Sequence, residues 1–451
     1  MALVVEGVVQ VVVADYYARR KNFFDKYPDF FADLPELEYG IYGALVMPKE
    51  RIEEIKYASE KVWEVLRKVK EHVLTLSHDE LEKLGYPSEL VPFLKLDYLS
   101  FDTVLSRFDF IVTDTEIKAI ELNNVTPFLV METFLMNNEI VKNENAENEN
   151  PKNENPKKEI LVSANENCEN EITSSYARGI IDCCNYLQIK KPKIAIVSQG
   201  MWEDWEEYAQ VDYIRSMIPP YLGDIEFFNI ADLTIELGEG AYTPSGDKID
   251  ILIMPAYPYE FLIHDVNENG EKVGIELLNL VESKKLALLN PPSANILQSK
   301  VTFAILWKMY MNGKLTPEDS EIVSQYVAPT YSEPFAFYVN GSSYVKKPVL
   351  SREGSSVEIH KEEETVKSKY DYYNDYNSVY QEFIELPKQT VIINNEFQEK
   401  RYIIGSFICN DKAVGLSCRL GEEITEWESH WLAVAHIEGE RQHDVKTTST
   451  I

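Results

Sequence analysis

The segment Ser106–Pro127 sets an arginine, two carboxylates and an amide, Arg107, Asp109, Glu121 and Asn123, among aromatic and branched aliphatic residues. Carboxylate and amide oxygens are hard ligands that suit Mg²⁺, which usually takes one or two carboxylates together with substrate phosphates. An adjacent arginine can bind a phosphoryl oxygen through its planar guanidinium. One interpretation is therefore a divalent-cation site beside a phosphate. The other is a solvated strand face with an incidental ion pair, because most charged side chains contact water.

These four side chains come together if the segment folds as a β-hairpin centred on Thr115. Residues 107–112 and 118–123 alternate polar and apolar side chains, as half-buried strands do, and the residues between them are polar. Directly opposed side chains lie about 5 Å apart, so one face of the hairpin is apolar and the other carries the polar group. The predicted cross-strand pairs are Arg107–Asn123, Phe108–Leu122, Asp109–Glu121 and Phe110–Ile120.

The composition narrows the class of protein. The chain has 451 residues, enough for two or three domains, and its hydrophobic content of 45% is ordinary for a globular protein. Its 75 acidic and 44 basic residues give a net charge of −31, which disfavours nucleic acid as a partner and is compatible with a cationic small substrate. The five cysteines show no CxxC spacing, so we expect reduced thiols and a cytoplasmic protein.

Periodicity predicts the elements that position the hairpin. Ile52–Leu74 carries one apolar stripe at helical spacing, Ser77 to Glu80 form a capping box that starts a short helix, and Phe128–Val141 is also helical. The apolar residues 1–15 lack the basic start of a signal peptide and are too short to cross a bilayer, so we expect a docking strand or a poorly ordered end and no membrane partner.

Two further segments have a distinct composition. Residues 142–159, KNENAENENPKNENPKKE, have almost nothing to bury, which predicts a disordered insertion. Between residues 173 and 292, short apolar runs alternate with amphipathic segments, which is typical of strands covered on both faces in an α/β domain.

A second group of residues has the chemistry to hold phosphate. Lys300 begins an apolar helix, although a lone lysine in that place is usually solvated. Lys347 ends an apolar strand and precedes a turn with Gly354, Ser355 and Ser356, whose small side chains let backbone N–H groups approach phosphate oxygens. By itself this turn matches no Walker or dinucleotide motif.

Five stretches in one order give the chain a resemblance to a known family. They are SRFDF…AIELNNVTP, ILQSKVTFAILW, YVKKPVLSREGSSV, YQEFIELP and IIGSFICNDKAVGLSCR, within Tyr86–His436. Together they resemble the synthetase part of the glutathionylspermidine synthase family, without its amidase domain. The resemblance implies an ATP-grasp fold. It implies a helical N-terminal region with the hairpin (1–141), the low-complexity insertion (142–170), a pre-ATP-grasp-like α/β domain (171–295), the ATP-grasp domain (296–437) and a tail (438–451).

The resemblance also implies roles for single residues, with ATP and two Mg²⁺ ions bound. Asp109, Glu121 and Asn123 resemble the Mg²⁺ ligands, and Arg107 resembles the catalytic arginine that stabilises the transferring phosphoryl group. The remaining ATP-binding residues implied in this way are Lys300 and Lys347 for the phosphates, Arg352, Glu353 and Gly354 in a flexible lid, Gln381 near the adenine, and Arg419 near the phosphoryl group.

On the substrate side, Glu206 and Glu207 resemble carboxylates that contact substrate, although an acidic helix face more often contacts solvent. Glu260 and Thr126 are further candidates, while Phe128 replaces a hydroxyl residue of glutathione-binding members.

The expected activity is an ATP-dependent carboxylate–amine ligase. It forms an acyl phosphate from a peptide or amino acid and transfers the acyl group to a polyamine or amino acid. Alternatives are a non-catalytic ATP-binding regulatory protein, or an α/β scaffold whose hairpin binds Ca²⁺ or nothing. A homodimer is expected by analogy only.

Overall fold

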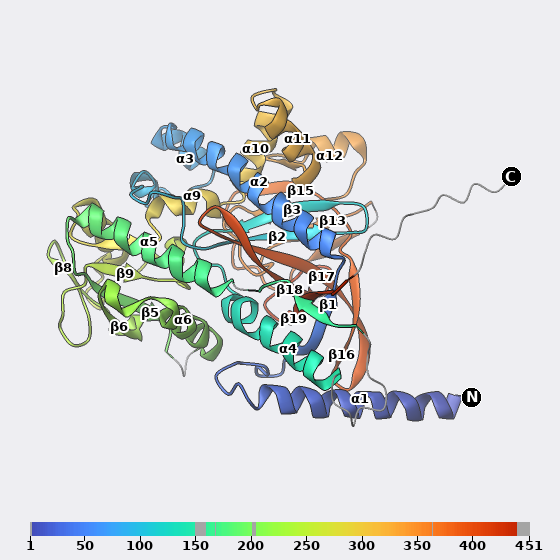
Figure 1. Ribbon diagram of the computed structural model, residues 1–451. Helices are drawn as coiled ribbons and strands as arrows, with labels where there is room; N and C mark the ends of the chain where they lie inside the picture. The colour runs from blue at the N-terminus through green and yellow to red at the C-terminus, as the bar shows by residue number, and fades with distance from the viewer. Residues whose placement is uncertain (1, 149–158, 167, 201–203, 363, 440–451) are drawn as a thin grey trace.

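The computed structural model describes residues 2–148, 159–166, 168–200, 204–362 and 364–439, and its largest sheet contains the predicted hairpin (Figure 1). The strands of this sheet run in the order β1-β19-β18-β17-β2-β3, with β16 beside β17 and β4 beside β19. Their bounds are β1 Gly40–Val46, β2 Ser106–Val112, β3 Ile117–Asn123, β4 Leu161–Ser163, β16 Lys388–Ile393, β17 Glu396–Cys409, β18 Lys412–Gly421 and β19 His430–Ile437.

Helix α2 (Lys49–Leu74) packs along this sheet in contact with β3, β17 and β18 (Figure 1). The predicted apolar stripe of this helix is confirmed, because its residues are buried, namely Ile55, Val62, Val65, Leu66, Val69 and Val73. The capping box is confirmed as well, since Ser77 Oγ accepts from the Glu80 backbone and the Ser77 backbone donates to Glu80 Oε2 at 2.9 Å. It starts the short helix α3 (His78–Lys83).

A second sheet is parallel and has the order β10-β9-β5-β6, as the alternating apolar runs predict for an α/β region. Its strands are buried or half-buried because helices cover the sheet. The bounds are β5 Lys193–Ser198, β6 Asp224–Asn229, β9 Ile251–Ile253, β10 Ala287–Leu289, with helices α5 Glu169–Leu187, α6 Trp205–Met217, α7 Tyr259–Leu262 and α8 Val273–Glu282.

A third, antiparallel sheet delivers Lys347 and Gln381 and has the order β11-β15-β12-β13-β14. Its strands are β11 Thr330–Tyr331, β12 Tyr344–Pro348, β13 Glu358–His360, β14 Thr365–Lys367 and β15 Ser378–Glu382. The helices of this part of the chain are α9 Asn295–Gln298, α10 Val301–Met311, α11 Pro317–Tyr326 and α12 Phe335–Asn340. Lys300 precedes α10, as predicted.

The hairpin register is confirmed except at one pair. Arg107 pairs with Asn123 and Asp109 with Glu121, but Phe110 pairs with Ala119 instead of Ile120. The prediction for Phe110 was wrong because a β-bulge leaves Ile120 outside the ladder. The Ile120 carbonyl instead accepts hydrogen bonds from Lys347 at 3.5 Å and Gln381 at 3.2 Å. The bulge thereby ties the hairpin to the third sheet.

Two predictions of poor order were wrong where the structure describes the chain. Residues expected to form a docking strand or frayed end lie in helix α1 (Ala2–Phe24), and the start of the expected insertion continues helix α4 (Asn137–Asn148). Asn145 stabilises this helix through two hydrogen bonds with the backbone of Leu161 in β4. Its Nδ2 donates to the Leu161 carbonyl at 2.8 Å, and its Oδ1 accepts from the Leu161 N–H at 2.9 Å. Strand β4 also lies within the expected insertion of residues 142–170. Residues 149–158 and the expected tail from residue 440 onward lie outside the described residues.

The predicted division at residue 141 does not separate two sheets, because β1, β2 and β3 share one sheet with β17, β18 and β19.

Within the described residues, no helix combines the length and apolar character needed to cross a membrane. All five cysteines are free thiols. The other helices and strands are η1 Val91–Phe93, the π-helix η2 Glu132–Met136, η3 Pro220–Leu222, η4 Ile230–Asp232, β7 Thr234–Glu236, β8 Gly240–Tyr242 and η5 Pro292–Ala294.

Candidate active site

A cleft of about 470 Å³ opens between the hairpin, the third sheet and the start of α6. It is lined by all of the predicted site residues except Glu260. The residues that the sequence singles out therefore share one cleft, although they come from segments far apart in the chain. The fold brings these segments together mainly through the shared large sheet and the contacts of Ile120.

Arg107 and Asp109 form a buried ion pair at the centre of the hairpin. The Arg107 Nε lies 2.8 Å and its Nη2 lies 3.2 Å from the two Asp109 oxygens, while Nη1 donates to the Phe128 carbonyl at 2.8 Å. Burial opposes the charge of Arg107, but the Asp109 carboxylate outweighs it and raises the arginine pKa. Burial likewise opposes ionisation of Asp109, but Arg107 and Arg419 lower its pKa, so both groups stay charged.

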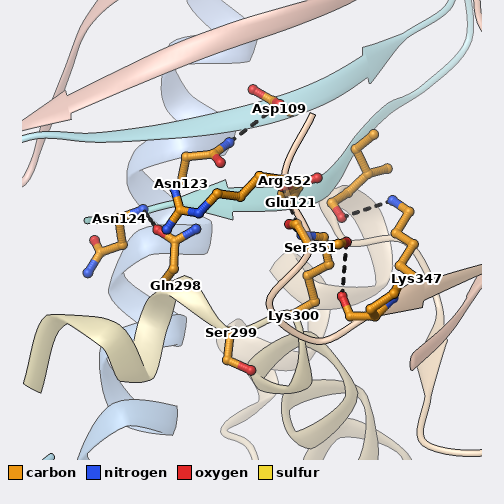
Figure 2. A network of polar contacts seen from close by, with 12 residues as sticks. Asp109, Glu121, Asn123, Asn124, Gln298, Ser299, Lys300, Lys347, Ser351 and Arg352 are labelled. Carbon is orange, nitrogen blue, oxygen red and sulfur yellow. Dashed lines mark hydrogen bonds and ion pairs between the residues drawn. The ribbon is translucent and has the colours of Figure 1, made fainter. Parts of the chain in front are cut away.

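The three predicted metal ligands lie together on this hairpin. Asn123 Nδ2 contacts Asp109 Oδ2 at 3.5 Å, and Glu121 lies 3.0 Å from the Lys300 ammonium (Figure 2). Among the described residues, no group of three or more His, Cys, Asp and Glu side chains is placed to bind a metal. Two carboxylates and an amide nevertheless fit Mg²⁺, which completes its coordination with phosphate and water oxygens.

Lys300 and Lys347 reach the same part of the cleft from different elements (Figure 2). Lys300 Nζ donates to the Ser351 carbonyl at 2.5 Å, and the backbone N–H of Lys300 donates to the Val349 carbonyl at 2.8 Å. Lys347 Nζ donates to Gln381 Oε1 at 2.7 Å, and burial lowers the pKa of Lys347 to about 8.

The end of β3 is tied to the helix that precedes Lys300. Gln298 Oε1 accepts from the backbone N–H groups of Asn124 at 2.7 Å and Val125 at 2.9 Å (Figure 2). Gln298 is buried, so these hydrogen bonds form away from water and hold the hairpin against α9. They fix the position of Lys300 relative to the carboxylates of the hairpin.

The loop of residues 351–356 contributes residues 351–355 to the lining of the cleft and is held from two sides. Arg352 Nε donates to Glu260 Oε1 at 2.8 Å, and Arg352 Nη1 donates to Thr126 Oγ1. Gly354 has a φ of +69°, in the left-handed region that favours glycine, and an added Cβ would lie 2.8 Å from the Thr425 carbonyl. Glu260 is fully buried behind the loop, so in this structure it binds the loop arginine instead of facing the cleft.

The two predicted substrate carboxylates on α6 have different environments. Glu207 is hydrogen-bonded to Gln199 through the backbone at 2.6 Å and the side chain at 3.1 Å. Burial and, after it, the negative charges of Glu132 and Asp204 raise the pKa of Glu206 to about 8. Glu206 and Glu207 both line the cleft, together with Asp204.

Sequence reasoning missed Tyr39, Glu132 and Gln210. Tyr39 lines the cleft and its hydroxyl donates to Glu132, while Gln210 donates to the same carboxylate. Glu132 did leave a signal, because it is the one charged residue within the apolar helical run FLVMETFLM. Tyr39 and Gln210 left no local pattern that distinguishes them.

Comparisons with known proteins relate the chain to a family and to a fold. The family described as Glutathionylspermidine synthase preATP-grasp matches residues 36–437. A Haemophilus influenzae protein named "Putative acid--amine ligase" is 24% identical over 234 residues, which cover 50% of this chain and 52% of that protein. The chain thus spans about half the length of this curated relative. A glutathione synthetase-like effector from Globodera pallida, solved in its apoform, shares the fold with a TM-score of 0.53 and 11% identity, covering 88% of this chain and 89% of that one.

Proposed function

The chain belongs to the glutathionylspermidine synthase preATP-grasp family, and we propose that it is an ATP-dependent ligase that joins a carboxylate to an amine through an acyl phosphate. The observation that carries this proposal is the polarity of the cleft. Arg107, Lys300 and Lys347 line it from the hairpin, the start of α10 and the third sheet, and Glu206 and Glu207 line it from α6. Such a site can hold the triphosphate of ATP and a cationic amine at the same time.

The cations that line the cleft are the groups that phosphoryl transfer requires. This reaction depends on positioning and on neutralising charge, with little covalent chemistry for the protein to perform. Lys300, Lys347, Arg352 and Arg419 bind the phosphates in this proposal, with Glu353 and Gly354 in the covering loop and Gln381 beside the adenine. Arg107 contacts the transferring phosphoryl group. It is already oriented by Asp109 and the Phe128 carbonyl.

The hairpin donors Asp109, Glu121 and Asn123 would hold Mg²⁺. When bound, Mg²⁺ neutralises charge on the phosphate oxygens and orients them. Asp109 and Glu121 are now paired with Arg107 and Lys300. The same carboxylates therefore position the cations that surround the phosphates.

In the proposed reaction, an oxygen of the substrate carboxylate attacks the γ-phosphorus, and ADP leaves. The acyl phosphate reacts with the amine, so that a C–N bond forms and the bond to the phosphate oxygen breaks. Water would hydrolyse this intermediate, so the loop of residues 351–356 must exclude it. The acid is proposed to be a peptide or amino acid near Thr126, and the amine a polyamine or amino acid near Glu206 and Glu207.

A screen for ADP release tests this proposal. Amines are combined with amino acids and small peptides in the presence of ATP and Mg²⁺, with glutathione plus spermidine as the first pair. The Lys300→Met variant serves as the control for contaminating ATPases, because it removes a phosphate-binding cation. ADP release that needs both substrates and is lost in this variant supports a ligase. ATP binding without ADP release in any mixture would favour the non-catalytic regulatory alternative.

A further inference from the structure

We propose that Tyr39 accepts a proton from the attacking amine and that Glu132, buried behind it, receives the hydroxyl proton of Tyr39. The inference rests on the proposed ligase function, because it assigns the proton acceptor of its second step. It starts from Glu132, a fully buried carboxylate that contacts a residue of the cleft and has no role in binding phosphate.

Glu132 is 0% exposed and is held by uncharged donors. The Tyr39 hydroxyl donates to Oε1, and Gln210 Nε2 lies 3.0 and 2.8 Å from the two oxygens. The Gln210 orientation is fixed, because its Oε1 accepts from the backbone N–H groups of Val130 at 3.0 Å and Met131 at 3.1 Å. The amide must therefore present its donors to Glu132.

Tyr39 lines the cleft together with Arg107, Arg419 and Glu206. Its phenol interacts electrostatically with the two arginines, which are proposed to act on phosphate, and with Glu206, which is proposed to hold the amine. In the proposed reaction an amine held by Glu206 meets an acyl phosphate held by Arg107, and Tyr39 would lie beside the new C–N bond.

The chemistry at this position requires a proton acceptor. An aliphatic amine such as a lysine side chain has a pKa of about 10.4, so it is protonated at neutral pH and must lose protons to become an amide. The ammonium first passes one proton to Tyr39 Oη while the Tyr39 proton passes to Glu132 Oε1, which frees the nitrogen lone pair. As this lone pair forms the C–N bond, the C–O bond breaks, its electron pair leaves with phosphate, and the phosphate carries off the second N–H proton.

Glu132 is suited to take up and release a proton near neutral pH. Burial raises the pKa of Glu132 to about 7, while the hydrogen bonds from Tyr39 and Gln210 and the charge of Arg107 oppose the rise. Glu206 on α6 is a further titratable group that interacts with this carboxylate. A base with a pKa close to the working pH is the most effective proton acceptor.

The test compares two amines in the Tyr39→Phe and Glu132→Gln variants, with glutathione as the acid. Spermidine is protonated at neutral pH, whereas hydroxylamine is largely neutral and traps an acyl phosphate without a protein base. We expect amide formation with spermidine to fall about 100-fold, while hydroxamate formation with hydroxylamine stays nearly unchanged. Equal loss with both amines, or no loss with either, would overturn the proposal.

Two further measurements distinguish proton transfer by Tyr39 and Glu132 from a purely structural role of these residues. They also distinguish failure of this inference from failure of the proposed ligase function. Tyr86→Phe is the control, since Tyr86 is a buried tyrosine outside the cleft whose hydroxyl donates to Ile296. If the wild-type protein releases no ADP with any pair, the ligase proposal fails. Infrared difference spectra of wild type against Glu132→Gln then show whether the Glu132 carboxyl takes up and releases a proton. A protonated carboxyl signal that disappears as the pH rises through about 7 supports the inference. A carboxylate that never titrates overturns it.

Discussion

Arg352 and Glu260 form a buried ion pair, with 2.8 Å between Nε and Oε1, that joins the loop over the cleft to helix α7 beside the parallel sheet. Arg352 also donates to Thr126, which follows the hairpin. The Arg352 Nη2 and Glu260 Oε2 atoms are buried without a hydrogen-bond partner among the described residues. The loop arginine is therefore held by the protein itself, and this pair positions the loop above the cleft.

The Glu260→Gln variant tests how strongly this pair holds the fold. It leaves the Arg352 guanidinium, whose side chain is 17% exposed, without its counter-ion, and breaking a buried pair costs about 3 kcal/mol or more of the free energy of unfolding. Urea denaturation measures this loss. Glu428→Gln is the control, because its partner Lys369 is largely exposed and such pairs contribute less than about 1 kcal/mol. Equal losses in the two variants would contradict the assignment.

Arg107→Ala tests the role of the hairpin arginine in phosphoryl transfer. We expect ATP to bind within a few-fold of wild type, because both lysines remain, while turnover falls by about a factor of 10³, as for other arginines that act on a transferring phosphoryl group. Isothermal titration with ATP and steady-state ADP release measure the two quantities. Arg401→Ala, which removes a partly exposed arginine paired with Glu385, should leave both unchanged. Full activity of Arg107→Ala would exclude the proposed role.

Much of the site could be predicted because its parts are encoded locally. Alternation of polar and apolar residues in 107–110 and 120–123 indicated which side chains share a face, and a single bulge at Ile120 shifted only the pairs beyond Asp109. The apolar stripe of α2 and the capping box at Ser77 are likewise signals within one segment. Each depends on spacing along one element, which the sequence displays directly.

Long-range contacts could not be predicted in this way. The pairing of Arg352 with Glu260 joins residues 92 positions apart, and nothing in either segment indicates the other. The same holds for Tyr39 and Glu132, which are 93 positions apart. Residues 142–148 were misjudged for a related reason, since their asparagines gain order from hydrogen bonds to Leu161 and Tyr42 that composition alone does not reveal.

Glu121→Gln tests whether the hairpin carboxylates bind metal. Replacing one of two carboxylates removes a charged ligand, so we expect the Mg²⁺ concentration for half-maximal ADP release to rise about tenfold or more. Even the loss of a group that only hydrogen-bonds a metal ligand lowers metal affinity by about 10–100-fold. Glu423→Gln is the matched control, because its carboxylate lines the same cleft but lies 2.5 Å from Lys361. An unchanged Mg²⁺ titration of Glu121→Gln would show that the acidic patch has a structural role only.

The buried ammonium group of Lys347 makes the free energy of unfolding depend on pH in the alkaline range. Burial lowers the pKa of Lys347 from its usual 10.5 to about 8. Between these two values the unfolded chain binds the proton and the folded protein does not, so the free energy of unfolding rises with pH across this window. Below pH 8 the full cost of burying the cation applies, which amounts to about 3 kcal/mol at 1.36 kcal/mol for each pKa unit.

Lys347→Met removes this buried cation. Without nucleotide at neutral pH, we expect its free energy of unfolding to exceed that of wild type by at most about 3 kcal/mol, less the loss of the hydrogen bond to Gln381, with a smaller dependence on alkaline pH. ATP affinity falls, because a phosphate-binding charge is gone. Lys346→Met is the matched control on the same strand, where the side chain is 34% exposed and paired with Glu358, so it should give no such gain. Urea denaturation from neutral to alkaline pH measures both variants, and an unaltered pH slope in Lys347→Met would contradict the role of burial.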